Sequence, residues 1–215
     1  MRCRPLLYVS AIASAAYLLT TPWQPFPGSA ALKGIPVGAL AVFALLARGT
    51  RRDAGVLAIG LAISAMGDVL LNLDPHFFVF GLGAFLLTHI TYICLFVRNR
   101  NACIRLDPPL VAGVLLILAS SATLAAWIVP SVGDLAVPVV LYICAITAMV
   151  STALLARFPR RWVAIGAVLF LISDSLLAVQ RFKMPVPLDD YLVWTTYYLG
   201  QCGIALGYLG SAGRS

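Results

Sequence analysis

Long apolar segments alternate with short polar or proline-containing breaks along the whole chain. A transmembrane helix needs about 20 predominantly apolar residues, and most of these segments have that length. The breaks include TTPWQPFPGS, ARGTRRD, RNRNACIRLDPP and RFKMPVPLDD, which are rich in residues that end helices. We therefore predict eight transmembrane helices, at about residues 5–21, 30–47, 54–73, 80–97, 109–128, 135–156, 162–180 and 191–209.

Composition supports this interpretation and leaves little room for anything else. Hydrophobic residues make up 61% of the chain and charged residues only 11%, and such values are typical of a membrane protein. The predicted fold class is an all-α integral membrane protein, with residues 1–215 forming a single transmembrane domain. The net charge of +7 comes with no basic stripe that carries interleaved aromatic residues, so we expect no nucleic acid partner.

The arginines predict the orientation. All of them except Arg181 lie before the first segment, after the last, or in the second, fourth and sixth breaks. Since short cytoplasmic loops carry the excess of basic residues, both the N and C termini are expected in the cytoplasm. The expected location is the inner (plasma) membrane of a bacterium.

Two aspartates interrupt the apolar segments. Asp68 lies in SAMGDVLLNL and Asp174 in LFLISDSLLAVQRF, deep within their predicted helices. An ionisable side chain at the centre of a membrane helix costs about 2.5–3.5 kcal/mol on insertion scales. A helix-to-helix hydrogen bond in a membrane returns only about 0.6 kcal/mol on average, so a purely structural role explains these residues poorly. We therefore predict that both carboxyl groups belong to a functional site.

The two halves of the chain resemble each other around these aspartates. Asp68 and Asp174 are 106 residues apart, as are Tyr92 and Tyr198. An offset of four helices is consistent with two parallel four-helix repeats, which would bring both aspartates to a shared cavity. Chance is the alternative, because short matches are common in an apolar alphabet.

Further polar residues recur at helical spacing, which indicates faces turned toward protein or water rather than lipid. We predict that these residues bind substrate: Lys33, Ser64, Asn72, His89, Tyr92, Tyr198 and Gln201. The sequence contains no His pair at i, i+4 spacing and no nucleotide-binding or serine-hydrolase motif, so we expect no metal and no cofactor.

Two carboxyl groups that share a low-dielectric site can hold one proton between them, which suits acid–base catalysis through an oxocarbenium-like state. Within a membrane, the expected substrate of such chemistry is a lipid. Two alternatives remain at this point, a proton-coupled transporter and a lysolipid-binding protein without turnover. Proline does not interrupt either aspartate-bearing segment, which favours the enzyme over the transporter.

Four segments resemble the YhhN family of eight-span membrane proteins, which includes lysoplasmalogenases. They are SAMGDVLLNL, GLGAFLLTHITY, LFLISDSLLAVQRF and TTYYLGQCGIALG, in the family's order. The resemblance implies hydrolysis of the vinyl-ether bond of lysoplasmalogens, with Asp68 and Asp174 as the family's intramembrane acidic pair. The family tends to carry Lys directly before Pro in the second helix, whereas here two residues separate Lys33 from Pro36.

Overall fold

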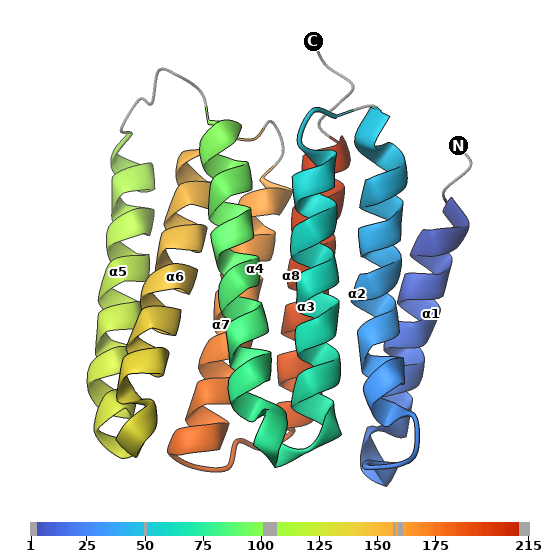
Figure 1. The fold of residues 1–215 in the computed structure, drawn as a ribbon. Coiled ribbons are helices and arrows are strands. Elements are labelled where there is room, and N and C mark those ends of the chain that lie inside the picture. The colour runs from blue at the N-terminus through green and yellow to red at the C-terminus, as the bar shows by residue number, and fades with distance from the viewer. Residues whose placement is uncertain (1–3, 50, 101–106, 157, 159–160, 211–215) are drawn as a thin grey trace. The chain divides into compact units, whose positions relative to one another are not determined.

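The computed structural model describes residues 4–49, 51–100, 107–156, 158 and 161–210. Every regular element in these ranges is helical, and eight α-helices follow one another along the chain (Figure 1). Short 3-10 turns extend several of their ends. The helices are α1 Arg4–Thr20, α2 Ser29–Leu46, α3 Ala54–Leu73, α4 Phe78–Arg98, α5 Pro108–Ile128, α6 Ala136–Leu155, α7 Trp162–Phe182 and α8 Asp189–Leu209.

Each predicted segment coincides with one of these helices, because local sequence signals define the ends. Asp74 adopts an extended conformation after α3, and Pro75 follows it. Two prolines occupy the first turn of α5, where their missing amide hydrogen costs nothing. Pro36 lies within the second turn of α2, and the hydroxyl of Ser10 donates to its carbonyl oxygen at 2.7 Å.

Seven of the helices, α1 to α7, are long and apolar enough to cross a membrane. The chain is therefore a multi-pass membrane protein with an all-helical fold. In the described part of the chain α8 does not reach the same hydropathy. It begins with Asp189 and Asp190 and contains several Tyr and Gly residues, which lower its mean hydropathy although its length is sufficient. The crossing of the bilayer by α8 stays a prediction.

The orientation also stays a prediction. Several arginines that support it lie outside the described residues. These are Arg2, Arg105, Arg157, Arg160 and Arg214.

The chain divides into two compact units. The first contains α1, α2, α3 and most of α4, together with residues 208–210, and in it α2 packs against both α1 and α3. The second contains residues 96–207, and in it α6 packs against both α5 and α7. Each unit thus contains four helices that are consecutive in the sequence.

Glycines allow α7 and α8 to approach closely in the second unit. A Cβ atom added to Gly166 would lie 2.6 Å from both the carbonyl oxygen of Gly200 and the amide nitrogen of Ile204. A Cβ atom on Gly203 would lie 2.9 Å from the Cα of Gly166. Small residues that let two backbones touch are the usual basis of helix association in lipid.

A glycine also shapes the contact between α3 and α4 in the first unit. A Cβ atom on Gly60 would lie 2.5 Å from the ring of Tyr92, so the ring covers the bare backbone of α3 at this point. Tyr92 is fully buried there, and the hydroxyl of the neighbouring Thr88 donates to the carbonyl oxygen of Gly60 at 3.4 Å.

We predict that Gly166→Ala lowers the thermal unfolding midpoint in detergent, because the new methyl group meets rigid backbone of α8. The cost of such overpacking is about 1–3 kcal/mol. Gly113→Ala on α5 is the matched control, since a Cβ atom there meets nothing within 4 Å. Equal midpoints for the two variants would contradict the close α7–α8 contact.

Candidate functional site

Asp68 lies in the middle of a polar stripe on α3. It is 2% exposed, and Ser64, one turn earlier on the same helix, is fully buried. Asn72 follows one turn later, and because α3 is continuous from Ala54 to Leu73 the three side chains share one face. The local sequence alone determines this arrangement, through the spacing of four residues.

Around Asn72, three helices of the first unit meet in a polar cluster. The hydroxyl of Tyr17 on α1 donates to Asn72 Oδ1 at 3.4 Å, and Asn72 Nδ2 donates to Ser29 Oγ on α2 at 3.1 Å. Lys33 Nζ lies 5.6 Å from the centre of the Tyr17 ring, within the range of a cation–π contact. The structure thus brings two of the predicted substrate-binding residues, Lys33 and Asn72, to the same tyrosine.

Sequence reasoning missed Tyr17 and Ser29. Tyr17 is 4% exposed and Ser29 is 3% exposed, so both hydroxyl groups are buried polar groups in an apolar bundle. Tyr17 follows Ser10 and Ser14 at intervals of four and three residues on α1, and all three are buried. That spacing was the signal in the sequence that could have identified this face of α1.

His89 and Tyr92 lie on one face of α4, and both are fully buried in the structure. The ring of Tyr92 packs on Gly60, as described above. Both residues therefore belong to the interior of the protein rather than to a lipid-facing surface.

In the second unit, Asp174 on α7 has a defined partner. The hydroxyl of Tyr142 on α6 donates to Asp174 Oδ2 at 2.6 Å. Tyr142 is 8% exposed, whereas Asp174 is partly exposed. This hydrogen bond holds one of the two carboxylate oxygens, Oδ2. Sequence reasoning missed Tyr142, although it is the only aromatic residue in α6.

The predicted residues of α8 lie beside a group of aromatic rings. Trp194 stacks on Tyr198 with ring centroids 6.2 Å apart and planes inclined by 8°. Tyr197 packs edge-on against Phe170 of α7 at 5.2 Å. Gln201, one turn after Tyr197, is fully buried. The polar face of α8 is therefore held by stacking within the second unit.

Asp68, Ser64, Asn72, Lys33, His89 and Tyr92 belong to the first unit, and Asp174, Tyr198 and Gln201 belong to the second. Each unit thus contains one of the two aspartates, together with some of the other predicted site residues.

The other histidine, His76, lies in the short 3-10 turn between α3 and α4. The backbone N–H of His76 donates to Asp74 Oδ1 at 2.8 Å, and its ring nitrogen Nδ1 lies 2.5 Å from the same oxygen. These contacts, the backbone hydrogen bond first, lower the pKa of Asp74 below its ordinary value. The stabilisation from this contact is thus present at neutral pH and lost as the pH falls through the lowered pKa. Among the described residues, no group of three His, Cys, Asp or Glu side chains could hold a metal ion.

The chain is similar to known proteins over most of its length. The model of the YhhN family matches residues 28–208. A lysoplasmalogenase of Mycobacterium bovis is 36% identical over 210 residues, which cover 94% of this chain and 78% of that protein. The lysoplasmalogenase TMEM86A of Bos taurus is 32% identical over 192 residues, covering 83% of this chain and 77% of that protein.

The lysoplasmalogenase TMEM86B of Homo sapiens is also 32% identical, over 183 residues that cover 85% of this chain and 76% of that protein. No solved structure matches the chain. The family match covers most of the chain, including both aspartates. This protein belongs to the YhhN family.

Proposed function

We propose that this protein is a lysoplasmalogenase. It hydrolyses the vinyl-ether bond of a lysoplasmalogen and releases a fatty aldehyde and glycerophosphoethanolamine or glycerophosphocholine. The observation that carries this proposal is that relatives named lysoplasmalogenase are 29–36% identical over most of the chain. The substrate is an amphiphile, which suits a protein with hardly any mass outside its apolar helices.

Vinyl-ether hydrolysis needs a proton donor and a proton acceptor. One carboxyl group gives its proton to the vinylic carbon that is not bonded to oxygen, and the ether carbon becomes an oxocarbenium ion. The second group, as a carboxylate, stabilises this cation and then accepts a proton from the water that attacks it. The resulting hemiacetal breaks its bond to the glycerol oxygen, which takes up a proton, and the aldehyde leaves.

We propose that Asp68 and Asp174 are this pair. Both lie within helices in which a carboxyl group is costly. Asp68 is almost entirely buried, and Asp174 has one oxygen held by the Tyr142 hydroxyl. The mechanism requires both side chains to reach the same vinyl-ether group, and this requirement is part of the proposal.

We propose that Lys33 binds the phosphate of the head group. Its ammonium group lies over the Tyr17 ring, which is in turn hydrogen-bonded to Asn72, one helical turn from Asp68. In a lysoplasmalogen the phosphate and the vinyl ether are separated only by the glycerol carbons, so the two groups need sites a short distance apart. We propose that Ser64, Asn72, His89, Tyr92, Tyr198 and Gln201 bind the substrate or the attacking water.

We also propose that α8 crosses the bilayer, that both termini are cytoplasmic, and that the protein resides in the plasma membrane of a bacterium. Two parallel repeats of four helices fit the same sequence. In support, positions at the offset of 106 residues are buried in both α3 and α7, including Leu57 with Val163 and Leu61 with Ala167. Gly60 and Gly166 are at the same offset, and each lies at a close helix contact.

We predict that Asp68→Asn and Asp174→Asn each lower the rate of aldehyde release about 10²- to 10⁴-fold, the usual contribution of one acid–base group. The assay uses purified protein in detergent with lysoplasmenylethanolamine, and the saturated alkyl-ether analogue should release no aldehyde. Asp134→Asn, at an exposed position in the 3-10 turn before α6, is the control. Full activity in either folded variant would remove that aspartate from the mechanism, and no turnover by the wild type would remove the proposed function.

Tyr142 is predicted to act through Asp174. Tyr142→Phe removes only the hydroxyl that holds Oδ2, so kcat should fall about three- to tenfold while KM stays unchanged, in line with the loss of one hydrogen bond. Tyr8→Phe, at a tyrosine that is 65% exposed, should change neither value. Wild-type kcat in folded Tyr142→Phe would show that the contact is dispensable.

Lys33→Met should raise KM about tenfold and leave kcat nearly constant, because a charge-assisted contact to the phosphate is lost. Lys33→Arg should recover most of the loss, since it keeps the charge. Lys183→Met is the control, since this lysine contacts Ser131 and Trp127 in the second unit. If KM is the same in Lys33→Met and the wild type, this lysine does not bind the head group.

A further inference from the structure

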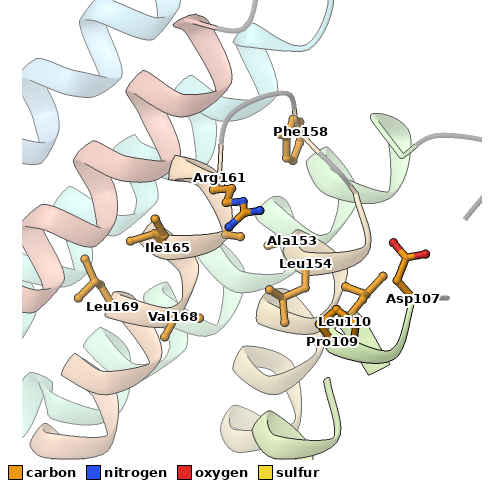
Figure 2. Close-up of a pocket in the computed structure, with 11 residues that line it drawn as sticks. Asp107, Pro109, Leu110, Ala153, Leu154, Phe158, Arg161, Ile165, Val168 and Leu169 are labelled. Atoms are coloured by element: carbon orange, nitrogen blue, oxygen red, sulfur yellow. The ribbon is translucent and has the colours of Figure 1, made fainter. Parts of the chain in front are cut away.

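A cavity of about 660 Å³ lies in the second unit, where α5 begins, α6 ends and α7 begins. This volume is within the range of small-molecule sites, which is about 300–1,000 Å³. Side chains of all three helices line the cavity, and most of them are apolar, such as Leu110, Leu154 and Val168 (Figure 2).

Two charged residues of opposite sign complete the lining. Arg161 at the start of α7 extends toward α6, and Asp107 just before α5 stands on the other side of Leu154 in Figure 2. Both residues are exposed. The cavity therefore combines apolar walls with one cationic and one anionic group.

The cavity runs inward from the end of the helices. From Arg161 to Leu169 it follows α7 over eight residues, or about 12 Å at the helical rise of 1.5 Å per residue. Because α7 is a membrane-spanning candidate, the charged residues lie toward a membrane surface and the apolar walls toward the hydrocarbon. A membrane lipid is arranged in the same way, with its charged head group at the membrane surface and its chains in the hydrocarbon.

This cavity is separate from the proposed chemistry. Asp174 lies 13 residues after Arg161, about 20 Å away along the helix, and does not line the cavity. A lysolipid with its phosphate at Arg161 would hold its glycerol close to that end of α7 and far from the aspartate.

We propose that this cavity is a second, non-catalytic lipid site that binds a phosphoethanolamine head group. The guanidinium of Arg161 binds the phosphate, for which its planar fork is well suited, and the carboxylate of Asp107 binds the ammonium group. One hydrocarbon chain lies along α6 and α7. A phosphoethanolamine head group carries one charge of each sign, as the lining of the cavity does. The bound lipid is either a lysophospholipid or a diacyl phospholipid of the bilayer.

The test uses a saturated lysophosphatidylethanolamine with a photoreactive diazirine on its chain. The probe has no vinyl ether, so its binding is independent of hydrolysis. Full-length protein in a non-ionic detergent is irradiated and the labelled peptides are identified by mass spectrometry. We expect labelling of α6 near Leu154 and of α7 between residues 161 and 169.

Arg161→Gln and Asp107→Asn should each reduce this labelling about two- to fivefold, the effect of one exposed ion pair. Arg181→Gln, at the opposite end of α7, and Asp134→Asn are matched controls and should leave the labelling unchanged. Aldehyde release should be the same in all four variants and the wild type. Failure of the lipid site is therefore distinguishable from failure of the proposed catalysis.

A lysophosphatidylglycerol probe, which lacks the ammonium group, completes the experiment. It should label wild type less than the ethanolamine probe does, and Asp107→Asn should abolish or reverse this preference. A diacyl ethanolamine probe that labels the same peptides supports the bilayer lipid as occupant, and labelling by the lyso probe alone supports a lysophospholipid. Unchanged labelling in Arg161→Gln, or no preference between head groups in wild type, would overturn the proposal.

Discussion

The structure depends on how polar side chains are accommodated within an apolar helix bundle. Hydrocarbon offers no hydrogen-bond partner, so each such group needs another protein group or water. Asn72 contacts α1 and α2 through Tyr17 and Ser29, and Asp174 contacts α6 through Tyr142. These contacts join different helices, so they align the helices of each unit while they hold the groups proposed for catalysis.

Close backbone packing serves the same purpose by a different means. Gly166, Gly200 and Gly203 let α7 and α8 touch, and Gly60 lets the Tyr92 ring lie on α3. In lipid the hydrophobic effect does not drive helices together, so contact area and interhelical hydrogen bonds must do so. The glycines and the buried hydroxyl groups together hold polar helix faces in the protein interior, where we propose that the head group binds and water reacts.

The sequence predicted the helices well and the contacts between them poorly. Helix ends such as Asp74-Pro75 and the prolines of α5 are encoded locally, so the segment boundaries agree with the structure within a few residues. The polar stripe of Ser64, Asp68 and Asn72 likewise follows from spacing on one helix. The partners Tyr17 and Tyr142 could not be assigned, because they come from other helices and only the packing of the bundle determines which side chain they meet. Mean hydropathy separates α8 from the other helices, since its Tyr, Gly and Asp residues lower it.

The central claim is that a side-chain carboxyl group protonates the vinylic carbon and that water then adds to the ether carbon. Hydrolysis in ¹⁸O-labelled water, with borohydride present to trap the aldehyde as an alcohol, tests this claim most directly. The account predicts that the heavy oxygen enters the trapped alcohol and that the glycerophosphoethanolamine product carries none. Heavy oxygen in the glycerol product would mean that water attacks the glycerol carbon instead, and the carboxyl-based mechanism would be wrong.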